Sequence, residues 1–197
     1  MVEFICLYGS IDGSGDEVTI STDYKKVKRH HNNKDFWDWF SGPFESSYSL
    51  PLVHYIIKMP ATAGLTIKDY KSRTRIDNIK TELKLNTYKG DVDIENLFGG
   101  IDLETYKGEV RVSFSKINNN SRFETYKGDI TVEIPKGNGF GLRTDFERRV
   151  DFTSDFDVTE IERGRKHRFH DYEGKINGGG PTLELESKKG EIRLKAK

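Results

Sequence analysis

An eight-residue sequence recurs three times in this chain, as "TYKGDVDI", "TYKGEVRV" and "TYKGDITV", beginning at Thr87, Thr105 and Thr125. These threonines are 18 and 20 residues apart, and Thr144 follows the third after 19 residues. A short fixed period is typical of solenoid proteins, in which each repeat forms one coil that packs only against its neighbours. The repeat therefore predicts a stack of coils in which equal positions lie about 4.8 Å apart.

Weaker copies of the repeat lie on both sides of these three. "DYKSRTRI" begins at Asp69, 18 residues before Thr87, and "SKKGEIRL" begins at Ser187. The 43 residues between Thr144 and Ser187 are enough for about two coils with an insertion. We therefore expect a single β-solenoid domain of roughly six to seven coils across residues 1–197, each coil of 18–20 residues.

Apolar and charged residues alternate inside each repeat. A period of two predicts β-strands with one face toward a core and the other toward solvent, so the fold class is all-β. We expect two strands of about five residues in each coil, two stacked sheets, and a corner glycine that adopts positive φ. The predicted inward positions are Leu85, Val92, Leu103, Val110, Ile130, Val132 and Leu185. The corner glycines are Gly90, Gly108, Gly128 and Gly190.

The strength of the pattern varies along the chain. Regular repeats are expected at residues 61–158, after N-terminal coils at 1–60 and before a final coil at 181–197. The alternation is interrupted at 25–49 and at 159–180, which we interpret as inserted loops.

The two ends of such a stack would expose unpaired sheet edges. The segment "DFWDWFSGPF", residues 35–44, has five aromatic residues and is expected to cap the first coil. At the other end we expect an open edge on which Lys195 and Lys197 oppose pairing with another chain, giving a monomer or weak dimer. In the alternative interpretation the aromatic segment is exposed and contacts a partner or a sugar ring. The residues that would make this contact are Trp37, Trp39 and Phe40.

Stacking would also align equal side chains of successive repeats. Tyr88, Tyr106 and Tyr126 are expected to form a structural ladder, beside a row of lysines and a row of acidic residues. The same tyrosines are candidate contacts for a partner or a glycan. Opposite charges two residues apart offset repulsion within each row, although an exposed pair contributes at most about 1 kcal/mol.

Composition excludes several classes of function. Lys+Arg and Asp+Glu are equal at 32 each, which disfavours a general nucleic-acid binder. The single cysteine, Cys6, excludes an internal disulfide and a cysteine-based zinc site. No hydrophobic run approaches the roughly 20 residues of a membrane helix, so we expect no membrane span.

Candidate binding residues outside the repeats are few. The five histidines do not form a closed set of metal ligands, so no metal or cofactor is expected. The stretch "ERGRKHRFHDYEG" is interpreted as a solvated insertion, with anion binding as the alternative. The candidate anion contacts are Arg163, Arg165, Lys166 and Arg168.

Two stretches carry a family resemblance: "HYIIKMPATAGLTIKDY", which leads into the repeats, and "INGGGPTLELESKKGEIRL" near the end. Over residues 53–194 the chain resembles a family of bacterial adhesin-type domains of uncharacterised function. The resemblance implies a β-solenoid and a non-enzymatic module of envelope-associated proteins. The start "MVEFICLYGS" has none of the features of a secretory signal peptide, so the compartment is expected from the resemblance only.

The favoured function is a non-catalytic structural or adhesin-like module that binds a surface, a glycan or a protein through repetitive β-faces. One alternative is a polysaccharide-active β-helix enzyme, which needs acidic and basic residues that break the repeat register. Residues 145–171 are the region where the sequence shows such a break. Another alternative is a self-assembling scaffold that resembles the bactofilins, whose solenoids join end to end.

Overall fold

A computed structural model describes residues 9–14, 17–22, 56–157, 159–160 and 173–197. The chain divides into two compact units, residues 1–59 and residues 60–197, which are described separately. The inserted loop at 25–49 and its aromatic residues lie outside the described residues. The expected aromatic cap, and the expected single domain over 1–197, therefore stay predictions.

The first unit contains one described sheet. Strands β1 (Gly9–Ser14) and β2 (Glu17–Thr22) pair antiparallel as a hairpin, with Gly9 opposite Thr22 and Ser14 opposite Glu17.

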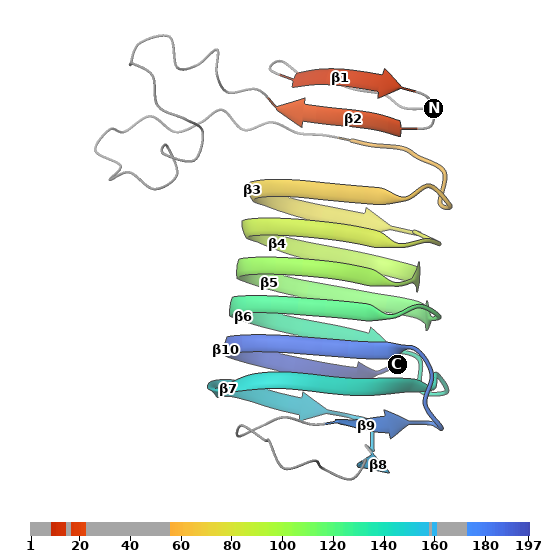
Figure 1. Cartoon of the computed structure of the whole chain (residues 1–197), viewed down its shortest axis with the longest axis vertical. Helices are drawn as coiled ribbons and strands as arrows, with labels where there is room; N and C mark the ends of the chain where they lie inside the picture. Colours follow the sequence, from red (N-terminus) through yellow and green to blue (C-terminus); the bar gives the residue numbers. More distant parts are fainter. Residues whose placement is uncertain (1–8, 15–16, 23–55, 158, 161–172) are drawn as a thin grey trace, which may run out of the picture. The chain divides into compact units, whose positions relative to one another are not determined.

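The second unit is built from long strands that pair mainly in parallel (Figure 1). Every regular element among the described residues is a strand, so the all-β class is confirmed. The long strands are β3 (Leu65–Asp77), β4 (Leu83–Gly99), β5 (Ile101–Ile117), β6 (Ser121–Ile134), β7 (Phe140–Ser154) and β10 (Thr182–Ala196). Two short strands, β8 (Thr159–Glu160) and β9 (Glu173–Ile176), complete the sheet.

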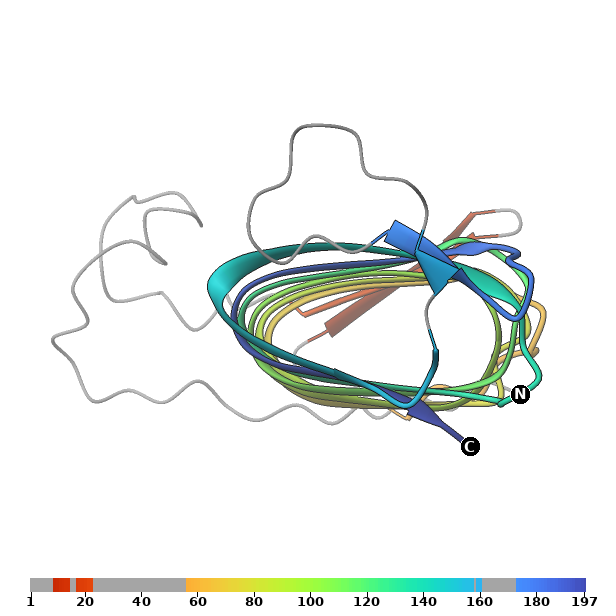
Figure 2. The same ribbon diagram turned by 90° about the horizontal axis from the view of Figure 1, so that it is seen from below.

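Each long strand bends around a shared interior. Figure 2 shows the strands of this unit as nested, flattened loops. The expected pair of short strands per repeat is wrong in detail, because β4 runs for 17 residues through Gly90 without interruption. The bend at the glycine therefore lies within a continuous strand.

The repeats fix the register between the first strands. Thr87 of β4 pairs with Thr105 of β5, and Thr105 pairs with Thr125 of β6, so equal repeat positions are neighbours, as predicted. The same pairing places Lys71, Lys89, Lys107 and Lys127 in one row.

The C-terminal strand does not take the last place in the stack. The order of strands is β3-β4-β5-β6-β10-β7-β9-β8, and β10 pairs in parallel with both β6 and β7 (Figure 1). Ser187 pairs with Thr125 on one side and with Phe146 on the other. The expected alignment of Thr144 with the repeated threonines is therefore wrong, since Thr144 pairs with Leu185.

The C-terminus is tied to the end of β6 and to the residue that directly follows β7. The Lys197 amide donates to the Ile134 carbonyl at 3.0 Å, and the Ala196 amide donates to Asp155 Oδ2 at 3.1 Å. The expectation that Lys195 and Lys197 guard an open edge is wrong, because their strand lies between two others. Instead, the edge beyond β7 pairs antiparallel with β9, which lies within the segment expected to be an insertion.

The inward side chains form a single apolar core. Val110, Val132 and Leu185 are fully buried, and all seven predicted inward positions are confirmed. In β7, Phe140 and Phe146 fill the interior, and Phe146 packs at a tilt against Phe152 with ring centroids 5.3 Å apart.

The corner glycines are required mainly by the distance between strands. A Cβ on Gly108 would lie 1.9 Å from the carbonyl oxygen of Gly90, and a Cβ on Gly190 would lie 2.1 Å from that of Gly128. Positive φ was expected at all four, but only Gly108 (153°) and Gly190 (130°) adopt it. The presence of glycine at these four corner positions, the glycine row, is therefore explained mainly by close contact between neighbouring backbones. The bend of the strand explains it less well.

Candidate functional site

Four tyrosines form a continuous ladder on the outer surface where the strands bend. The ring centroids of Tyr70, Tyr88, Tyr106 and Tyr126 are 5.0, 4.6 and 4.8 Å apart in order, and neighbouring rings are nearly parallel. The predicted ladder is thus confirmed, and Tyr70 extends it by one strand. The ladder ends at β10, where Lys188 Nζ lies 5.5 Å from the centre of the Tyr126 ring.

Stacking limits what the ladder can bind. Each inner ring has a neighbouring ring on both faces, so its exposed parts are the ring edge and the hydroxyl group. A sugar that stacks on an aromatic residue needs a free ring face. The ladder therefore offers no stacking platform at Tyr88 or Tyr106.

Replacing Tyr106 with alanine is expected to lower the free energy of unfolding by about 1–2 kcal/mol, because two stacked contacts are lost. Urea denaturation measures this change. Tyr106→Phe keeps both contacts and is the matched control, expected to unfold like the parent. An alanine variant as stable as the phenylalanine variant would show that stacking adds nothing.

A row of lysines follows the tyrosines. Lys107, Lys127 and Lys189 are exposed, while Lys89 is half-buried and its Nζ lies 5.2 Å from the Tyr88 ring centre. In β7 the row continues with Arg149, which pairs with Lys189. The row thus places one cation on every long strand of the second unit. Its members are Lys71, Lys89, Lys107, Lys127, Lys189 and Arg149.

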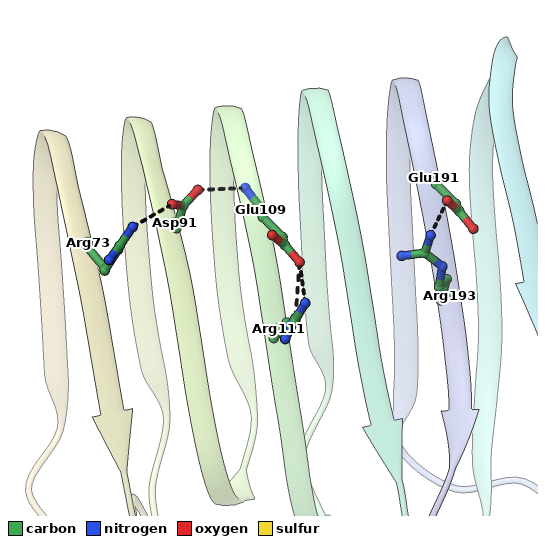
Figure 3. A network of polar contacts seen from close by, with 6 residues as sticks. All are labelled: Arg73, Asp91, Glu109, Arg111, Glu191 and Arg193. Atoms are coloured by element: carbon green, nitrogen blue, oxygen red, sulfur yellow. Dashed lines mark hydrogen bonds and ion pairs between the residues drawn. The ribbon is translucent and has the colours of Figure 1, made fainter.

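Acidic side chains lie two residues after the lysines, and they already have partners (Figure 3). Asp91 accepts the Glu109 amide at 3.2 Å and pairs with Arg73 at 3.9 Å. Glu109 pairs with Arg111 at 2.7 Å. Closer to the C-terminus, Asp129 accepts the Glu191 amide at 2.8 Å, and Glu191 pairs with Arg193.

Arginine makes every ion pair found among the described residues, and lysine makes none. Besides the pairs above, Arg75 contacts Glu95 at 2.9 Å. Since the acidic row is engaged by arginines and backbone amides, it leaves the lysine row without carboxylate partners in the described part of the chain. This row is therefore able to contact an external anion.

A second row of acidic side chains lies two residues before the tyrosine positions in the sequence, and an arginine neutralises part of its charge. Glu124 and Glu186 both contact Arg122, at 2.8 and 3.2 Å. Burial lowers the pKa of Arg122, but the hydrogen bond and charge of Glu186, together with Glu124 and Glu184, outweigh this and raise its pKa above the ordinary value. Arg122 therefore remains a cation that holds these carboxylates.

A groove of 620 Å³ lies across β6, β10 and β7, where the tyrosine ladder ends. Its walls include Tyr126 and the buried Thr125 and Ser187, whose hydroxyl groups have no hydrogen-bond partner within the described residues. The charged residues that line it are Glu124, Lys127, Asp145, Glu147, Arg148, Arg149, Glu186, Lys188 and Lys189.

The groove forms where the repeat is irregular. From Phe146 to Arg149 β7 advances three residues while β10 advances two, from Ser187 to Lys189, so β7 contains a bulge. Val150 of β7 stands opposite Gly190, the corner glycine of β10. The sequence signal for this site is the stretch "TDFERRV", in which the "TYKG" pattern is lost. This stretch by itself predicts only the start of an irregular region.

The other candidate residues belong to parts of the chain that the structure does not describe. Arg163, Arg165, Lys166 and Arg168, like Trp37, Trp39 and Phe40, lie outside the described residues. Within the described ranges, no cluster of histidine, cysteine and acidic residues could hold a metal ion. Those ranges also contain no helix with the length and apolar character needed to cross a membrane.

Comparison with known proteins gives one match. No curated protein and no solved structure matches the chain. A family model described as Toastrack DUF4097 matches residues 61–195, which include the long strands up to the last residue but one of β10, and both rows of the candidate site. Because this match covers more than half of the sequence, the chain belongs to the Toastrack DUF4097 family, an uncharacterised family whose name suggests a β-solenoid-like repeat.

Proposed function

We propose that this protein is a non-catalytic, adhesin-like module of the bacterial cell envelope that binds an acidic glycan through its repetitive surface. The observation that supports this most is the lysine row, whose members have no carboxylate partner in the described residues, while arginines such as Arg73, Arg111 and Arg122 hold the acidic side chains. The proposal takes each of the six long strands as one coil of a β-solenoid, with its two flattened sides as stacked sheets.

The geometry favours a linear ligand that runs across the strands. The tyrosine rings of successive strands are 4.6–5.0 Å apart, and equivalent residues of these strands share this spacing. The lysines therefore present positive charge at regular intervals. A polymer with a carboxylate on each sugar could contact several lysines at once, and each contact would add to the avidity. The stacked tyrosines would keep the row regular without contacting the ligand through their faces.

The first test is the binding of oligogalacturonate, a chain of carboxylated sugars, with neutral dextran as the comparison. Replacing Lys71, Lys89 and Lys107 together with glutamine is expected to weaken oligogalacturonate binding about 10–100-fold, since each exposed ionic contact contributes about 0.5–1 kcal/mol. Calorimetry at low ionic strength measures the affinity, which should fall as salt is added.

The matched control replaces three exposed lysines outside the row, Lys68, Lys84 and Lys116, with glutamine. This variant loses the same net charge and should bind nearly as well as the parent. Equal weakening in both variants would show that binding depends on net charge and not on the row. Equal binding of dextran and oligogalacturonate would also contradict the proposal.

A second candidate function, a polysaccharide-active enzyme, is favoured by the groove in the region where the repeat breaks. Asp145, Glu147 and Arg148 all belong to its lining, which is the mixture of acidic and basic residues that such an enzyme needs. Incubating the protein with oligogalacturonate and measuring new reducing ends tests this function. Cleavage that disappears in Asp145→Asn would replace the binding proposal with an enzymatic one.

A further inference from the structure

We propose that the groove across β6, β10 and β7 is a binding site for a compact oxyanion, a phosphate or sulfate group carried by a larger ligand. It goes beyond the proposed function in its ligand and in its site, a groove, although three of the five cations, Lys127, Lys189 and Arg149, also belong to the lysine row. Five cations line the groove: Lys127, Lys188, Lys189, Arg148 and Arg149.

These cations come from three adjacent strands and are gathered by strand order. Lys127 belongs to β6, Lys188 and Lys189 to β10, and Arg148 and Arg149 to β7. Because β10 inserts between β6 and β7, side chains separated by about 60 residues of sequence line one hollow. All five are exposed, and none has a carboxylate partner among the described residues, whereas Arg122 and Arg143 nearby are paired.

The bulge in β7 makes this cluster different from the rest of the lysine row. Elsewhere each strand contributes one cation to the row, but here β7 places both Arg148 and Arg149 in the groove, and β10 adds Lys188 beside Lys189. Bulges often redirect side chains at functional sites. Two arginines supply several fixed N–H donors, which suit the oxygens of a phosphate or sulfate group.

The acidic residues of the groove restrict how an anion could bind. Glu124 and Glu186, which come two residues before Tyr126 and Lys188 in the sequence, are both paired with Arg122. Asp145 and Glu147 also line the groove and would repel an anion close to them. The oxyanion is therefore expected at the side of Lys189 and Arg149, and removal of the Glu147 charge should strengthen binding.

The probes are tripolyphosphate and a sulfated disaccharide, added separately to the whole chain at low ionic strength. Replacing Lys189 and Arg149 together with glutamine is expected to weaken binding about tenfold or more, because each charge-assisted hydrogen bond contributes more than a neutral one. Glu147→Gln should tighten binding several-fold. Calorimetry gives the affinities, and backbone amide shifts in β6, β10 and β7 locate the bound probe.

The matched control is the Lys68→Gln, Lys84→Gln double variant, which loses the same charge from exposed lysines that lie outside the groove and outside the lysine row. It should keep parental affinity for both probes. Tighter binding of tripolyphosphate would indicate that the ligand carries a phosphate group, and tighter binding of the sulfated disaccharide would indicate a sulfate group. Either result supports the site. Binding of neither probe, or equal loss in both double variants, would overturn the inference.

Discussion

Replacing Val110 with aspartate is expected to destabilise the second unit strongly. Val110 is fully buried in the middle of β5, and its neighbours across the sheet, Val92 and Ile130, are buried as well. An aspartate there would place a carboxylate in an apolar interior without a partner, at a cost of about 3–5 kcal/mol. Since whole domains are stable by only about 5–15 kcal/mol, the melting temperature should fall steeply or the transition should vanish.

Lys116→Asp is the control for this substitution. Lys116 lies in the same strand but is exposed, so the new carboxylate remains in water and the melting temperature should change little. Circular dichroism with temperature measures both variants. A Val110→Asp protein that melts with its parent would show that the inward face of β5 has been assigned wrongly.

Gly108→Ala is expected to destabilise the unit by about 2–4 kcal/mol, although it adds only one methyl group. The new Cβ would lie 1.9 Å from the Gly90 carbonyl oxygen, and the φ of 153° at this position is unfavourable for alanine. The contacting atom belongs to the backbone of the neighbouring strand, so relief requires β4 and β5 to separate.

Gly137→Ala is the matched control, because a Cβ at Gly137 would meet no atom within 4 Å and its φ is not positive. Alanine there should leave stability unchanged or raise it slightly by restricting the unfolded chain. Chemical denaturation of both variants measures the difference. If the two alanine variants were equally stable, close backbone contact would not explain the glycine row.

Much of the fold was predictable because repeats carry the same information at each position. The spacing of Thr87, Thr105 and Thr125 indicated the register, and the alternation around Val110 indicated the core. The tyrosine ladder followed from the same register. These features depend on local periodicity, which is visible in sequence.

The position of β10 was not predictable by the same reasoning. The closing repeat begins at Ser187, and its pattern would fit beside any other repeat. Its local sequence therefore does not determine which strands it pairs with. The register of β7 also differs from the alignment of the repeats, because Phe146 and not Thr144 faces Ser187. Strand order is decided by long-range packing and by anchors such as the Ala196 contact with Asp155.

The residue types that form the candidate site were predictable from the sequence, but the ion pairs between them were not. Sequence placed a lysine row between aromatic and acidic rows, and suggested that opposite charges would neutralise one another. The structure pairs the acids with arginines instead, as in Glu109 with Arg111, and so leaves the lysines available. The groove depends on the insertion of β10, and its cations therefore could not be grouped from sequence.

The most direct test of the proposed binding surface is a nuclear magnetic resonance titration of the intact protein with oligogalacturonate. We predict that the side-chain signals of Lys71, Lys89 and Lys107 shift together and saturate at one ligand concentration, while those of Lys68, Lys84 and Lys116 stay in place. No shift in the row, or shifts that are equal in both groups of lysines, would contradict the proposal.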